Sequence, residues 1–186
     1  PSPYFNSWRW GNNADDAHVD ACLQYFDKLY TAITDTTQGA FANVFRLHLD
    51  PCWTNDPDKK SDGKESGEAD ISRFSAQRLE KYLRSLYFPL ARKAVGHGLY
   101  VVMRPPGVCP KTIQAGGEYQ QYLMTVWDIV SRNDSVRKYA GQLSIELANE
   151  PVQVTDSTGQ ETPQALQQFF QPIVNKIRAN GFTGII

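Results

Sequence analysis

Two glutamates four residues apart lie in one short apolar segment, and this spacing could support acid–base chemistry. Glu146 and Glu150 belong to the segment LSIELANEP (143–151). Side chains alternate across a β-strand, so a strand here would place both carboxylates on one face. Because Pro151 disfavours a helical conformation in the residue before it, we expect Glu150 to be extended and to end the strand. A carboxyl group in a partly dehydrated cleft can have its pKa raised enough to act as a general acid near neutral pH. The alternative is that Glu150 pairs with an arginine for structural reasons.

A second apolar run, ANVFRLH (42–48), carries a cation. Alternation predicts Val44, Arg46 and His48 on one face of a strand and apolar residues on the other. A guanidinium group is permanently charged, so Arg46 needs carboxylates nearby. Arg46 therefore either serves a polar site or pairs with Glu146 as a purely structural contact.

Four helical patterns alternate with four short apolar strands along the chain. Apolar residues spaced three and four apart predict the helices, and short apolar runs predict the strands. The helices are expected near 19–33, 79–94, 119–130 and 163–177, and the strands near 41–49, 99–104, 143–150 and from 182 onward. Pro89 and Pro172 should bend the second and fourth helices. Alternating strands and helices predict a parallel sheet, either doubly wound or closed into a barrel, with its chemistry at the carboxyl ends of the strands.

The spacing of these units bears on domain organisation. The chain has 186 residues, the size of one ordinary domain. Each strand–helix unit takes roughly 40–55 residues, so eight units would need roughly 320 residues or more. The segment GII (184–186) also has the composition of an interrupted strand. We therefore expect residues 1–186 to form a single partial domain, a piece of a larger α/β barrel.

Both chemical segments resemble parts of a known enzyme family. The triplet NEP (149–151), preceded by IELA (145–148), resembles the fourth-strand signature of the glycoside hydrolase family 5 cellulases, and residues 42–48 are similar to the family's second strand. The resemblance covers essentially the whole chain and implies strands two to five of a (β/α)8 TIM barrel. It also implies a retaining endoglucanase that cleaves β-1,4-glucan, with Glu150 as general acid/base. Arg46 and Asn149 would orient the nucleophile and the sugar 2-hydroxyl. The family's nucleophile belongs to the seventh strand, outside this chain, so the isolated chain is expected to be inactive.

Aromatic residues, 12% of the chain, could supply stacking surfaces for sugar rings. Trp53 follows the predicted 41–49 strand closely, so we expect it at the rim of the cleft. Trp8 and Trp10 are further candidates for the same role, and all three could instead be core residues. Trp127 lies in the apolar stripe of a predicted helix and is expected in the core.

His48 and Arg104 complete the expected substrate-binding residues, because each comes at the carboxyl end of a predicted strand. Arg104 stands where many members of the resembled family carry a histidine. This departure leaves the substrate subclass open, so a mannanase, a xylanase or a xyloglucanase is the alternative to a cellulase.

Composition and motifs argue against several other classes of protein. The formal charge is −1, so the chain lacks the excess of basic residues typical of a nucleic-acid-binding protein. No apolar run approaches the roughly 20 residues of a membrane span. The sequence has neither a metal-binding motif nor a glycine-rich phosphate-binding loop, so we expect no cofactor and no metal, and a nucleotide-binding domain is disfavoured. Cys22 is expected to be buried, whereas a disulfide between Cys52 and Cys109 is left open.

The partial barrel carries two further expectations. Exposed sheet edges invite pairing, so the chain should associate with the C-terminal half of the barrel, either from the same protein after a break or from another copy. A polymeric glucan cannot enter a cell, so the protein is expected to be secreted, periplasmic or at the cell surface. The alternative outside enzymology is a non-catalytic carbohydrate-binding fragment, because the nucleophile is absent from this chain.

Overall fold

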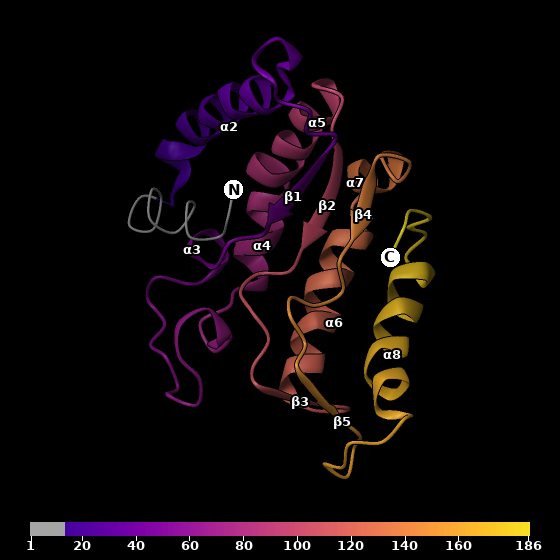
Figure 1. Ribbon diagram of the computed structural model, residues 1–186. Helices are drawn as coiled ribbons and strands as arrows, with labels where there is room; N and C mark the ends of the chain where they lie inside the picture. The colour runs from indigo at the N-terminus through magenta and orange to yellow at the C-terminus, as the bar shows by residue number, and fades with distance from the viewer. Residues whose placement is uncertain (1–13) are drawn as a thin grey trace.

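The computed structural model describes residues 14–186 as an α/β fold in which helices cover one face of a parallel sheet (Figure 1). The strands are β1 (Val44–His48), β2 (Tyr100–Arg104), β3 (Thr112–Gln114), β4 (Leu143–Ile145) and β5 (Gln153–Thr155). The α-helices are α2 (Val19–Thr34), α3 (Pro51–Thr54), α4 (Ala76–Tyr82), α5 (Phe88–Gly96), α6 (Glu118–Ser131), α7 (Asp134–Lys138) and α8 (Ala165–Ala179). Short 3-10 turns span Asp16–His18, Thr36–Gln38 and Gly67–Ala69, and a π-helical segment spans Leu83–Tyr87.

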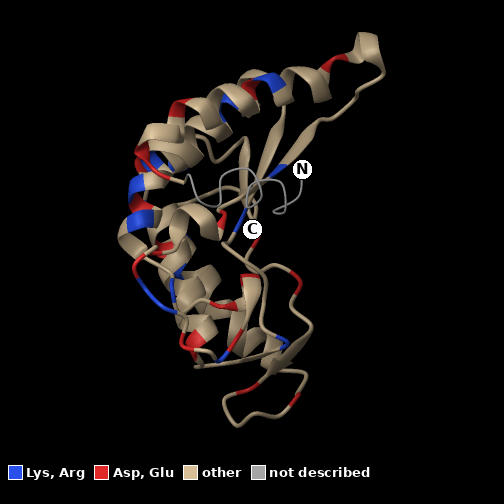
Figure 2. Ribbon diagram, turned by 90° about the vertical axis from the view of Figure 1, so that its left-hand side faces the viewer, with Lys and Arg blue, Asp and Glu red and all other residues tan. Residues whose placement is uncertain are grey.

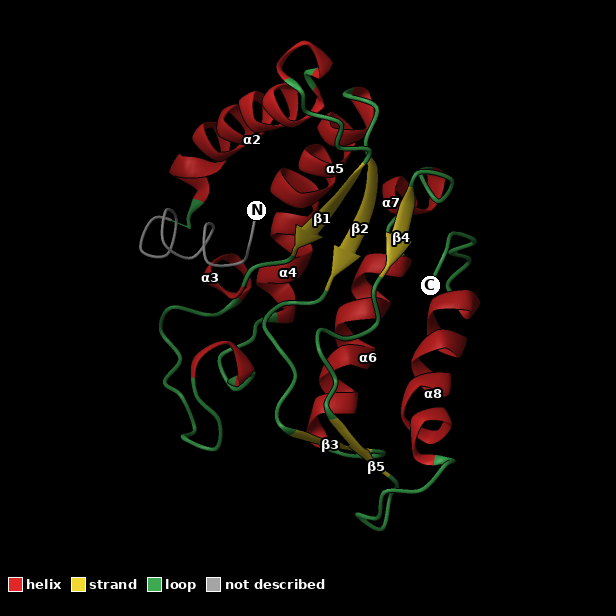
Figure 3. Cartoon of the chain, in the orientation of Figure 1, coloured by secondary structure: helices red, strands yellow, loops and turns green. Residues whose placement is uncertain are grey.

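The strands form two separate parallel sheets. The larger has the order β1-β2-β4, with Arg46 opposite Val102 and His48 opposite Arg104. The smaller pairs β3 with β5 and lies beyond the ends toward which the first three strands point (Figure 3). Because β3 follows β2 and β5 follows β4, the two neighbouring strands separate over residues 105–111 and 146–152 and then pair again.

The expectation of a (β/α)8 barrel portion is wrong. The described strands form sheets of three and two members instead of one continuous series of four. Pro105 and Pro106 directly follow β2 and have no N–H to donate, so the ladder cannot continue there. The strand expected from residue 182 onward is reduced to a single bridge between Ser144 and Ile185.

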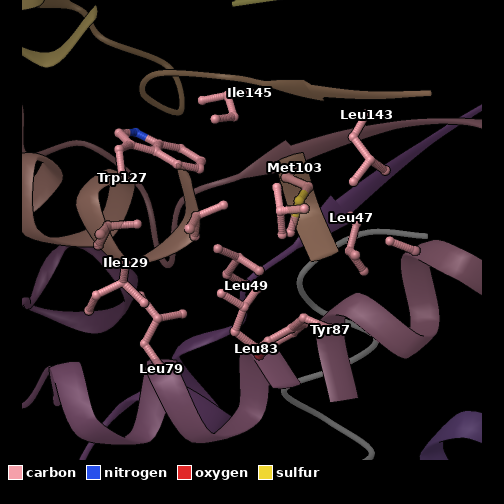
Figure 4. Close-up of a cluster of buried hydrophobic side chains, with 14 of the residues drawn as sticks. Leu47, Leu49, Leu79, Leu83, Tyr87, Met103, Trp127, Ile129, Leu143 and Ile145 are labelled. Atoms are coloured by element: carbon pink, nitrogen blue, oxygen red, sulfur yellow. The ribbon is translucent and has the colours of Figure 1, made fainter. Parts of the chain in front are cut away.

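The hydrophobic core lies between the larger sheet and its helices (Figure 4). Leu47 and Met103 from the strands face Leu83 and Trp127 from the helical layer, and each is at most 1% exposed. Burial of Trp127 confirms its assignment to the core. The opposite face of the sheet is open at β1, where Val44 is 50% exposed, so polar side chains on that face can reach solvent.

Proline shapes the second helical pattern. The sequence predicts one bent helix over 79–94, whereas the structure has α4, then the π-helical segment Leu83–Tyr87, then α5 with Pro89 in its first turn. The wider π turn accommodates the missing N–H of Pro89 and its ring. Charged residues of both signs are interspersed over the outer surfaces of the helices (Figure 2). Among residues 14–186, no helix combines the length and the apolar composition that a membrane crossing requires.

Candidate functional site

Glu150 does not end a strand, contrary to the sequence prediction. β4 stops at Ile145, and Glu150 lies in the following loop with a φ of 55°. It is the one non-glycine residue among residues 14–186 with a positive φ, in place of the extended conformation expected before Pro151. Such a conformation costs on the order of 1–3 kcal/mol and persists where the surrounding structure holds it. Here the Cys109 N–H donates to the Asn149 carbonyl at 3.1 Å, and the β3–β5 pair fixes the far end of the loop.

Arg46 joins this loop to β1. Its Nε donates to Glu146 Oε2 at 2.6 Å, and its Nη2 donates both to Glu146 Oε1 and, at 2.7 Å, to Asn149 Oδ1. The hydrogen bonds that Arg46 donates to Glu146 raise the pKa of Arg46 against the effect of burial, and the charge of Glu150 adds to the rise. Arg46 therefore forms the pair with Glu146 that the sequence left open as a structural contact. It also contacts the loop that carries Asn149 and Glu150.

The contact with Arg46 sets the orientation of the Asn149 amide. A guanidinium group can only donate hydrogen bonds, so the Asn149 carbonyl oxygen must face Arg46. The amide NH2 group then lies on the side away from Arg46. Because Asn149 is only 2% exposed, packing restricts it to this orientation. The contact with Arg46 thus leaves the NH2 group as the part of the Asn149 side chain that can donate hydrogen bonds.

His48 and Arg104 form a buried network. Both were expected to bind substrate, but neither side chain lies on an accessible surface. Both side chains are 3% exposed. Arg104 Nη2 donates to His48 Nε2 at 3.0 Å and to the Gly107 carbonyl at 2.8 Å, and it lies 3.7 Å from Glu68 Oε2. The Gly107 N–H also donates to His48 Nε2, at 3.1 Å. Since Nε2 accepts from two donors, the proton of neutral His48 must be on Nδ1.

Asp50 faces that proton and completes the buried network. Its Oδ2 lies 3.3 Å from His48 Nδ1, and its Oδ1 accepts from the Cys52 N–H at 2.8 Å, so it also caps α3. Burial lowers the pKa of His48, and the charge of Arg104 lowers it further, against the opposing effect of Asp50. Burial alone would raise the pKa of Asp50, but its hydrogen bonds with His48 and Cys52 outweigh burial and lower it. Burial and the charge of Arg46 lower the pKa of Arg104.

The expected aromatic rim is not formed by Trp53. This side chain is 1% exposed and packs edge-to-face on Tyr82 with ring centroids 5.0 Å apart. The four-residue helix α3 begins directly after β1 and turns Trp53 into the core instead of toward the strand ends. Trp8 and Trp10 lie outside the described residues. A stacking platform for sugar therefore has to come from other residues.

Cysteines and metal-binding groups add no further chemistry to this loop. Cys22, Cys52 and Cys109 are free thiols, so the disulfide left open by the sequence is not formed. Burial raises the pKa of Cys109, which keeps this thiol protonated. Within residues 14–186, no group of three or more His, Cys, Asp or Glu side chains is arranged to hold a metal ion.

Sequence reasoning missed two members of the buried network. Gly107 matters because its φ is 75° and because a Cβ there would lie 2.1 Å from the Glu68 carbonyl oxygen. The PPG sequence at 105–107 signals a turn but not its close approach to Glu68. Asp50 precedes Pro51, a helix-start signal that the sequence analysis did not use.

Comparison with known proteins adds no assignment to this site. A scan of protein-family models and searches of curated proteins and of solved structures each found no match to the chain. The resemblance to glycoside hydrolase family 5 therefore remains an expectation from the sequence, for which the segments 42–48 and 145–151 are the main basis.

Proposed function

We propose that this chain carries the acid/base part of a retaining glycoside hydrolase that cleaves β-1,4-glucan, with Glu150 as the general acid/base. The observation that supports the proposal is the arrangement around Arg46, which bonds both Glu146 and Asn149. The next residue, Glu150, is exposed to solvent and has a strained backbone. Strained residues concentrate at ligand-binding and catalytic sites, where the surrounding contacts hold them in place.

In the proposed reaction, Glu150 first donates its proton to the departing glycosidic oxygen. It then accepts a proton from the water that hydrolyses the glycosyl-enzyme intermediate. The Asn149 NH2 group donates to the sugar 2-hydroxyl, a contact that strengthens as positive charge develops on the ring. Arg46 holds the Asn149 amide in the orientation that this contact needs.

A retaining mechanism needs a second carboxylate as nucleophile, roughly 5–5.5 Å from the acid/base. Among residues 14–186, the carboxylates whose charge acts on Arg46 are Glu146 and Glu150. Glu146 is engaged by both arms of Arg46, which lowers the reactivity of its oxygens. The proposal therefore assigns the nucleophile to a partner segment, either from the same protein or from another copy of this chain.

Glu150→Gln tests the proposal, because glutamine keeps the size of the side chain but cannot transfer the proton. Reducing-sugar release from a soluble cellulose derivative is measured with the complete protein that contains this chain. We expect Glu150→Gln to lower turnover by about 100- to 10,000-fold, the range for loss of a general acid–base group. The matched control is Glu161→Gln, at an exposed position in the loop before α8, and it should retain wild-type turnover. Wild-type turnover by Glu150→Gln would contradict the proposal.

The substrate is defined by the same assay on purified polysaccharides. We expect β-1,4-glucan to be hydrolysed faster than mannan, xylan or xyloglucan, and the reverse order would assign the site to one of the other three activities. Because glucan is a polymer, the proposal also places the protein outside the cytoplasm, where such a substrate is accessible.

A further inference from the structure

A hollow lies between the segment 60–72 and the start of α6, next to the loop of Glu150. Its volume is about 620 Å³, within the range of small-molecule sites. The segment 60–72 forms one wall, and β3 and the first residues of α6 form the other. The hollow shares no residue with the group formed by Arg46, Glu146, Asn149 and Glu150.

The hollow combines apolar side chains with one buried hydroxyl. Ile71, Ile113 and Pro110 contribute its apolar lining. Tyr119 also lines it, is 6% exposed, and has its hydroxyl group beside the Cys109 thiol. A ligand that presents both C–H groups and hydroxyl groups would complement this lining.

Charges of both signs surround the hollow. Lys60 and Lys64 contribute two cations, and Asp62, Glu65, Asp70 and Glu118 contribute four carboxylates. Lys64 Nζ lies 2.8 Å from Glu118 Oε1 and 3.4 Å from Asp62 Oδ2, so it links the two walls. A strongly charged ligand would meet a like charge at this border, whereas a neutral polyol can donate to the carboxylates and accept from the lysines.

From this lining we infer that the hollow is a second carbohydrate-binding site, which holds one or two neutral sugar units of a β-linked oligosaccharide. The inference rests on the proposed function for its substrate class. The pyranose C–H face would lie on the apolar lining, and the hydroxyl groups would bond the charged border.

The hollow is close enough to Glu150 for one oligosaccharide to occupy both sites. Pro110 lines the hollow and directly follows Cys109, whose N–H bonds the Asn149 carbonyl. Thr112, also in the lining, pairs with Gln153 in the smaller sheet. Gln153 is three residues from Glu150, a separation of at most about 11 Å along the chain. A sugar chain cut at Glu150 would therefore gain affinity from the hollow.

The first test maps cellotetraose binding on the wild-type chain by NMR. We expect backbone amide signals of residues 69–72 and 112–119 to shift on titration. Shifts at residues 146–152 without any in the hollow would overturn the inference and leave the proposed function standing. Shifts in the hollow without hydrolysis by the complete protein would support the second site and contradict the proposed function. Because no substitution is needed, this map decides the case even where a variant does not fold.

The second test fills the hollow. Ala69 lines it, so Ala69→Trp should occupy its volume and weaken cellotetraose binding at least tenfold by calorimetry. The matched control is Ala179→Trp, at the exposed last residue of α8, which should bind as the wild type does. Equal affinity of the two tryptophan variants would overturn the inference.

Discussion

Two charged clusters lie at the same edge of the larger sheet and differ in their access to solvent. In the exposed cluster, Arg46 and Glu146 have side chains that are 45% and 24% exposed. In the buried network, His48 and Arg104 are 3% exposed. Arg46 and His48 are only two residues apart on the same face of β1, so the residue type and the strand face alone did not decide their roles.

The difference comes from what covers each cluster. The turn at 67–70 packs against residues 105–108, where the Glu68 carbonyl accepts from the Val108 N–H at 3.1 Å, and together they enclose His48. No comparable pair of segments encloses Arg46 within the part of the chain that the structure describes. A charge at a strand end therefore stabilises the fold where loops enclose it, and it remains accessible to solvent where they do not.

The largest effect on stability is expected from Gly107→Ala, which attacks the enclosure of the buried network. The methyl group would collide with the Glu68 carbonyl and would force the two segments apart, so that His48 loses its bond from Gly107. This collision and the cost of a positive φ for alanine should together lower the free energy of unfolding by about 3 kcal/mol, measured by urea denaturation.

Gly159→Ala is the matched control for Gly107→Ala. Its φ of 84° is similar, but nothing lies within 4 Å of the added methyl group, so it isolates the backbone cost. We expect a loss of about 1 kcal/mol for this variant. Equal losses in the two alanine variants would show that the close approach of Glu68 contributes nothing to stability.

The next largest effect is expected in the exposed cluster, from Asn149→Asp. Aspartate keeps the acceptor that Arg46 needs but replaces the NH2 group by an oxygen, so the donor toward the sugar is lost. Under the proposed function, hydrolysis of a cellulose derivative by the complete protein should fall about 100-fold, as for loss of one donor that stabilises a transition state.

Asn175→Asp serves as the control for this change. Asn175 is exposed on α8, and its Oδ1 accepts from Gln171, a role that aspartate can retain. It should leave turnover unchanged. Activity of Asn149→Asp within a factor of two of the wild type would remove Asn149 from the proposed mechanism.

Much of the secondary structure could be predicted from the sequence because it follows local periodicity. The predicted helices at 19–33 and 119–130 correspond closely to α2 and α6, and the strand at 99–104 corresponds to β2. The pair β3–β5 was missed because each strand has three residues and its partner is about 40 residues away, which leaves no local signal. The barrel was predicted from unit spacing, and spacing alone does not show where neighbouring strands separate.

Part of the candidate site was predictable in its residues, but its geometry was not, and the predicted site residues His48, Trp53 and Arg104 are buried. The alternation around Arg46 and the LSIELANEP segment brought Arg46, Glu146 and Asn149 into consideration, and the structure places the three in contact. The positive φ of Glu150 and the burial of Trp53 depend on contacts with distant segments. Such contacts override the local preferences that a proline or an aromatic residue expresses in the sequence.

The smallest effect concerns the pH dependence of the buried network. Because burial lowers the pKa of His48 below the value of about 6.5 expected in the unfolded chain, the unfolded state binds the proton first as the pH falls. The stability that neutral His48 contributes is therefore complete above pH 6.5 and declines below it, by at most about 1.4 kcal/mol per pH unit. Asp50 contributes no decline in this window, because its lowered pKa restricts its own titration to pH values below about 4.

Urea denaturation at pH 7.5, 6.5 and 5.5 measures the decline in the free energy of unfolding. In His48→Gln, whose side-chain oxygen can accept from Gly107 but does not titrate, the decline over this window should be smaller than in the wild type, and identical pH profiles would show that His48 is not the titrating group.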